Sequence, residues 1–146
     1  MLGQDAQVAL IDFGSCVLAR RDITDRIGLQ ELIMESERMC TSTFRAPELW
    51  DRGIDDVLEL DERIDVWALG CLLFTLMFGQ NPFELVELAG GNLKLAIIEA
   101  NFQFPSGHSY PKELCDLVTF MLNKNEKERP FIGEVLERSR AVVGKL

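Results

Sequence analysis

The chain has 146 residues, 47% hydrophobic and 27% charged, which suits one globular domain with a core. Its net charge of −9 argues against contact with nucleic acid or directly with a membrane through this segment, because anionic surfaces attract clustered lysine and arginine. No signal peptide is recognisable and the cysteines lack metal-ligand spacing, so a reducing, cytoplasmic compartment is expected; they are Cys16, Cys40, Cys71 and Cys115.

The first predicted element is a β-hairpin. The aliphatic run Val8 to Ile11 follows a turn-like sequence at residues 3–6, so Met1–Leu2 and this run are predicted to be its two arms. Residues 15–40 are mixed and polar with one weak helical pattern, and we expect a mobile segment there. A short helix is predicted to begin at Ala46 to Trp50.

The remainder of the chain is predicted to be helical, so the fold class is mainly α. Val66 to Phe78 has no polar face, which indicates a helix surrounded by protein, capped by Asp65 and ended by Gly79. The apolar run is shorter than the roughly 20 residues that a membrane span needs. Proline punctuation and apolar periodicity predict three further amphipathic helices, at residues 92–101, 111–122 and 131–142.

Three motifs occur in a fixed order. Asp12-Phe13-Gly14 ends the aliphatic run, Thr-Ser-Thr-Phe-Arg-Ala-Pro-Glu follows at residues 41–48, and Asp-Val-Trp-Ala-Leu-Gly at residues 65–70. This order and spacing resemble the second half of a eukaryotic protein kinase. The glycine-rich loop, the Val-Ala-x-Lys strand and the His-Arg-Asp-x-x-x-x-Asn loop do not occur in the sequence. The resemblance is therefore to a C-terminal lobe with the N-lobe and catalytic loop absent.

The resemblance implies a partial protein kinase domain over residues 1–146. Residues 1–14 would be the hairpin and metal-binding motif, 12–48 the activation segment and 49–146 the helical C-lobe. ATP and Mg²⁺ would be the cofactors of the intact kinase, and its substrates would be proteins with serine or threonine hydroxyls. No catalytic residue is expected within the chain, because the catalytic-loop aspartate would lie upstream of Met1.

Roles follow position by position from the resemblance. Asp12 would bind Mg²⁺ between the ATP phosphates, since a hard dication takes oxygen ligands. Phe13 would pack in the core beneath it, and Gly14 would permit the backbone turn. Thr41 begins the segment that we call the substrate loop, residues 41–45, and its hydroxyl implies serine/threonine specificity. The other residues of the substrate loop are Ser42, Thr43, Phe44 and Arg45.

Structural roles are implied for a second group of residues. Glu48 and Arg129 match a buried ion pair that ties the activation segment to the last helices, and losing one partner would cost roughly 3–5 kcal/mol. Asp65 matches a capping aspartate whose carboxylate accepts hydrogen bonds from the catalytic loop. Close packing around these positions is expected at Ala46, Pro47, Trp67 and Gly70.

Within the kinases, Cys-Thr-x-x-Phe-Arg-Ala-Pro-Glu-Leu and the helix after Asp65 are most similar to the Numb-associated kinase family. The small, lipid-anchored serine/threonine kinase branch is the nearest, and the long connection before Asp65 fits an extra helix after the activation segment. The branch implies membrane association through a lipid anchor upstream of this chain. Two alternatives stay open: a truncated or pseudokinase binding module without catalysis, and an unrelated helical scaffold.

Overall fold

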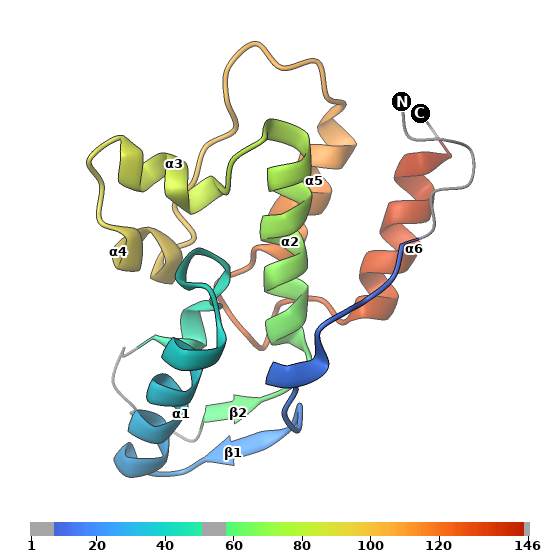
Figure 1. The fold of residues 1–146 in the computed structure, drawn as a ribbon. Helices are drawn as coiled ribbons and strands as arrows, with labels where there is room; N and C mark the ends of the chain where they lie inside the picture. The colour runs from blue at the N-terminus through green and yellow to red at the C-terminus, as the bar shows by residue number, and fades with distance from the viewer. Residues whose placement is uncertain (1–7, 51–57, 145–146) are drawn as a thin grey trace.

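The structure is a computed structural model that describes residues 8–50 and 58–144 (Figure 1). Helices dominate and one two-stranded antiparallel sheet is present, so the prediction of a mainly α fold is confirmed. In chain order the elements are η1 Phe13–Ser15, β1 Arg21–Ile23, α1 Arg26–Met39, η2 Ser42–Phe44, η3 Pro47–Leu49, β2 Leu58–Leu60, α2 Arg63–Phe78, α3 Pro82–Leu88, α4 Leu93–Ile98, α5 Lys112–Met121 and α6 Ile132–Val143, where η denotes a 3-10 helix.

Helix α2 stands at the centre of the fold, with α3 and α4 on one side and α5 and α6 on the other (Figure 1). It ends where Gly79 takes a left-handed conformation, φ 78°, and donates its N–H to the Thr75 carbonyl at 2.7 Å. The predicted cap at Asp65 is wrong: the N-cap is Glu62, and Asp65 lies inside the first turn. The predicted burial on all sides is also wrong, because Leu76 is 74% exposed.

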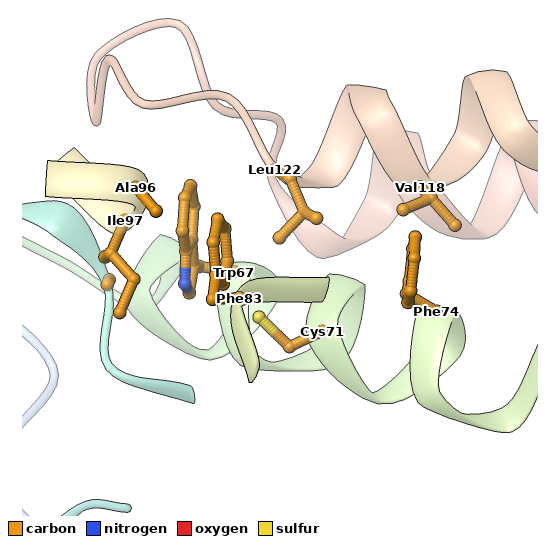
Figure 2. Packing of buried hydrophobic residues seen from close by; sticks show 9 residues of the cluster. Trp67, Cys71, Phe74, Phe83, Ala96, Ile97, Val118 and Leu122 are labelled. Atoms are coloured by element: carbon orange, nitrogen blue, oxygen red, sulfur yellow. The ribbon is translucent and has the colours of Figure 1, made fainter. Parts of the chain in front are cut away.

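The main core forms where α2 meets α3, α4 and α5. The rings of Trp67 and Phe83 stack with centroids 5.4 Å apart and planes 5° apart, and both side chains are fully buried (Figure 2). Such aromatic pairs contribute about 0.5–1.5 kcal/mol beyond the area that they bury. Other buried members of this cluster are Ala46, Cys71, Phe74, Ala96, Ile97, Val118 and Leu122.

A second, smaller core lies under the two-stranded sheet. Strands β1 and β2 pair antiparallel with Arg21 opposite Leu60 and Ile23 opposite Leu58. The Asp25 side chain caps helix α1 by accepting the Gly28 N–H at 2.7 Å. The apolar side of α1 packs on the sheet. The cluster consists of Ile23, Leu29, Leu32, Leu49, Leu58 and Leu60. Residues 15–40, predicted to be mobile, therefore contain a capped helix with buried side chains.

The residues before Asp12 differ from the predicted hairpin. Met1–Leu2 lie outside the described residues, and residues 8–11 form no strand: Val8 is 97% exposed. A strand needs a neighbour for its backbone hydrogen bonds, and no described strand lies beside this run. The extra helix was expected between Glu48 and Asp65; residues 51–57 of that connection lie outside the described residues, and Leu58–Leu60 form β2.

The C-terminal helices lie in the predicted ranges, and α4 and α5 are shorter than predicted. Helix α4 ends early because Ala100 adopts φ 48°, whereas α5 and α6 match their predicted ranges to within a residue or two. Helix α3 was not predicted; Asn81 caps it and Pro82 occupies its first turn. Among the described helices none is by itself long and apolar enough to cross a membrane, and α2 with α3 passes that test only as a bent pair.

Candidate functional site

The candidate site is the substrate loop, residues 41–45, with its continuation to Glu48. Two hydrogen bonds shape the loop: Phe44 N–H donates to the Thr41 carbonyl at 3.0 Å, and Arg45 N–H to the Ser42 carbonyl at 3.2 Å. Thr41 is exposed and Ser42 half-buried, whereas Thr43 is buried. The start of the loop therefore faces solvent while its second half is held by the fold.

Side chains from α3 hold the middle of the loop. The Asn81 side-chain amide donates to the Thr43 carbonyl at 3.2 Å, and the Thr43 hydroxyl donates to the Glu84 carboxylate at 3.5 Å. Sequence reasoning missed Asn81 and Glu84. The signal was present, since an asparagine followed by proline and, three residues after it, by glutamate is typical of a helix N-terminus.

The second half of the loop packs between the two cores. The Arg45 guanidinium is only 5% exposed and lies 4.7 Å from the centroid of the Trp50 ring, whose indole N–H donates to the Arg45 carbonyl at 3.4 Å. Phe44 is half-buried against the main core, and Ala46 and Pro47 are buried. These contacts fix the path of the backbone from the loop into η3.

Glu48 and Arg129 form a bidentate ion pair across 81 positions of the sequence. The guanidinium nitrogens Nη1 and Nη2 donate to Oε1 and Oε2 at 2.6 and 2.8 Å, and neither side chain is more than 1% exposed. Arg129 also donates to the carbonyls of Asn123 and Arg63 at 3.0 and 3.1 Å and lies 5.2 Å from the Trp67 ring centroid. The end of the activation segment is thereby joined to the segment before α6.

Gly70 allows α2 and α5 to approach closely. A Cβ at this position would lie 2.9 Å from Leu122 Cδ2 and 3.0 Å from Met121 Cβ. Trp67, one turn earlier, is fully buried, and its indole N–H makes no hydrogen bond to the described residues. Both residues serve packing in this structure.

The structure places Asp12, Phe13 and Gly14 at the surface. Phe13 is 67% exposed, so its predicted packing in the core is wrong. The residue in a left-handed conformation is Asp12, φ 63°, and not Gly14. No core residue lies over the Phe13 ring because residues 8–20 lie along the surface, exposed throughout.

Asp12 does not form a complete metal site. Within residues 8–50 and 58–144 no three acidic, histidine or cysteine side chains are grouped to hold a metal ion. Mg²⁺ in such sites is usually bound by one or two carboxylates together with substrate phosphates and waters, so Asp12 fits as one of its oxygen ligands. The other ligands of a bound Mg²⁺ would have to come from groups other than the described residues.

Asp65 is exposed, and its carboxylate makes no hydrogen bond to another described residue. It borders a cavity of about 300 Å³ that the start of the activation segment, α1 and the start of α2 line. Cys40 borders the same cavity, and burial raises the pKa of its thiol. Asp65 and Cys40, the residue before the substrate loop, therefore border the same cavity.

Comparisons with known proteins agree with this geometry. Residues 1–139 match the family model described as protein kinase domain. The chain is 35% identical over 135 residues to serine/threonine-protein kinase ppk13 of Schizosaccharomyces pombe, covering 90% of this chain and 38% of that protein. It is 30% identical over 142 residues to serine/threonine-protein kinase 16 of Mus musculus, covering 97% and 46%. The chain thus spans less than half the length of these relatives. With its mainly helical fold and two-stranded sheet, it belongs to the protein kinase domain family.

Proposed function

We propose that this chain supplies the substrate-facing part of the C-lobe of an ATP- and Mg²⁺-dependent protein serine/threonine kinase. The observation that carries the proposal is the contrast within the substrate loop, where Thr41 is exposed and Thr43 to Glu48 are held by buried contacts. A peptide hydroxyl must be positioned in line with the transferred group, and phosphoryl transfer depends chiefly on positioning and charge stabilisation. A loop with a fixed base and an exposed hydroxyl suits that task.

Bound ATP and Mg²⁺ would supply the phosphoryl group and neutralise its charge, as in kinases generally. The residues of this chain would contribute Asp12 as one oxygen ligand and Thr41 as a hydroxyl beside the peptide. By itself the chain should transfer no phosphate, because phosphate cradle, lysine and catalytic aspartate each change the rate by orders of magnitude.

The test uses the longest natural protein that contains this chain, with radiolabelled ATP and a peptide library. We expect transfer to serine and threonine peptides and not to tyrosine peptides. Thr41→Ala should lower peptide phosphorylation at least about tenfold while leaving ATP binding unchanged. Ser42→Ala, at the neighbouring hydroxyl, is the matched control. No transfer by the intact protein, or equal rates for Thr41→Ala and wild type, would contradict the proposal.

A non-catalytic binding module is the second candidate, and one surface favours it. An apolar groove of about 410 Å³ runs between α2, α5 and α6, where Leu72 is 44% and Leu76 is 74% exposed. Apolar grooves of this kind mark sites of contact with other polypeptide. Intact protein that binds other proteins through this groove and transfers no phosphate would support the module.

We also propose the finer assignment to the lipid-anchored branch of the Numb-associated kinases, with a cytoplasmic location and membrane association through an anchor outside this chain. Its support is the sequence Cys-Thr-x-x-Phe-Arg-Ala-Pro-Glu-Leu at residues 40–49. Mass spectrometry of the N-terminal peptide of the natural protein, with cell fractionation, tests the assignment. A protein without an acyl group that stays in the soluble fraction would count against it.

A further inference from the structure

The N-terminus of α3 lies against the substrate loop, and we propose that Asn81 and Glu84 are positioning residues that set the shape of this loop for peptide recognition. The inference rests on the proposed kinase function. Asn81 is not expected to touch the peptide, since it is only 1% exposed, whereas Glu84 is half-buried. Both would act through Thr43, which lies two residues after the exposed Thr41.

Asn81 uses both ends of its side-chain amide. Its Oδ1 accepts the Phe83 N–H at 2.9 Å, which caps α3, and its Nδ2 donates to the Thr43 carbonyl at 3.2 Å. Because an amide has its acceptor and its donor on fixed sides of one plane, the cap and the loop contact set each other's direction. A buried carbonyl that loses its donor is destabilised by the full desolvation of that group. The Thr43 carbonyl is therefore held in one place.

Glu84 adds a second, weaker connection. Its Oε2 accepts the Asn81 N–H at 3.4 Å, and its Oε1 accepts the Thr43 hydroxyl at 3.5 Å. These distances are at the long end of the hydrogen-bond range, so Asn81 carries most of the anchoring. Together the two side chains contact Thr43 at both its backbone and its side chain.

The N-terminus of α3, which carries Asn81, is itself held rigidly by the main core. Phe83, two residues after Asn81, is stacked face to face on Trp67 of α2 (Figure 2). Both rings are fully buried, so the first turn of α3 cannot shift without breaking the main core. Asn81 thus connects the substrate loop to α2. This contact sets the position of the exposed start of the loop.

Asn81→Ser separates the two bonds of Asn81. Serine caps helices about as well as asparagine, but its shorter side chain cannot reach the Thr43 carbonyl. Asn81→Asp keeps the size and the cap acceptor and lacks the donor, so it should affect the loop in the same way. Asn92 caps α4 through the Leu95 N–H at 3.0 Å and makes no hydrogen bond to the substrate loop. Asn92→Ser is therefore the matched control.

The measurement compares KM for peptide with KM for ATP in the intact protein. Asn81→Ser and Asn81→Asp should raise the peptide KM about five- to tenfold, the effect of one lost hydrogen bond, and change the ATP KM less than about twofold. Asn92→Ser should leave both constants unchanged. If both constants rise together in the Asn81 variants, or if Asn92→Ser raises the peptide KM equally, the residue is merely structural and the proposal is overturned.

Hydrogen–deuterium exchange provides a second measurement that needs no kinase activity. Amides of residues 41–46 should exchange several-fold faster in Asn81→Ser than in wild type or Asn92→Ser, with no change in α5. Unchanged exchange in the loop would overturn the positioning role. If wild-type protein phosphorylates no peptide, the proposed function fails, and the exchange data alone then decide whether Asn81 positions the loop.

Discussion

Glu48→Gln tests the role of the buried ion pair most directly. Glu48 accepts two bonds from Arg129, at 2.6 and 2.8 Å, and both side chains are at most 1% exposed. The substitution keeps the shape of the side chain but leaves the guanidinium charge buried without a counter-charge. Breaking a buried pair in this way costs about 3–5 kcal/mol, which is a large part of the 5–15 kcal/mol that stabilises a typical domain.

The double variant Glu48→Leu/Arg129→Met should recover only part of that loss. Replacing both charges with apolar groups can be neutral in general. Here, however, Arg129 also donates to the carbonyl of Asn123, and a buried carbonyl that loses its donor costs about 1–3 kcal/mol. The free energy of unfolding of the double variant should therefore lie between that of wild type and that of Glu48→Gln.

Urea unfolding of the protein that contains this chain, followed by circular dichroism, measures these differences. The control is Lys112→Ala, which removes the exposed i,i+4 pair with Asp116 and should change stability only slightly. A loss below about 1 kcal/mol for Glu48→Gln, or a loss for Lys112→Ala as large as for Glu48→Gln, would refute the reasoning.

Three further predictions concern acid stability, thiol reactivity and close packing. The hydrogen bond from Arg63 holds the pKa of Asp61 below its usual 3.8, so Asp61 stabilises the fold above that value and loses this effect as pH falls through its lowered pKa. Asp61→Asn should therefore reduce the loss of the thermal unfolding midpoint as the pH falls below 3.8. Burial raises the pKa of Cys71 to about 12, so iodoacetamide at pH 8 should label exposed Cys16 and spare Cys71 until urea is added, as peptide mass spectrometry would show. Gly70→Ala should cost about 1–3 kcal/mol in thermal unfolding, because its Cβ would overlap α5, and an unchanged midpoint would contradict this.

The sequence predicted α2, α4, α5 and α6 because their signals are local. Apolar periodicity and the flanking Gly79 and Pro111 placed α2 and α5 to within a few residues. Helix α3 was missed because it is short and its start depends on Asn81, whose cap was not recognised. Strand β1 was missed because three residues carry almost no pattern, and pairing with β2 decides their structure.

The contacts of the candidate site also differ in whether the sequence could predict them. The ion pair expected between Glu48 and Arg129 is present. It could be predicted because a motif match identifies both partners within the chain. The loop contacts of Asn81 and Glu84 follow no motif that the sequence analysis used, and they depend on how α3 lies against residues 41–45. A contact between distant segments could be predicted only where both ends carried a recognisable signal.

The motif residues also differ in burial, and the difference depends on where their partners lie. Arg129 contacts both Glu48 and Trp67 within the described residues, and all three are at most 1% exposed. Asp12 and Asp65 are exposed instead, and the catalytic-loop motif that the roles proposed for them would require does not occur in the 146 residues. A carboxylate retains its hydration until a cation or hydrogen-bond donors replace it, so these side chains are stable in water as they stand. The buried residues thus hold one another in place among the described residues, whereas the exposed carboxylates of Asp12 and Asp65 remain open to solvent.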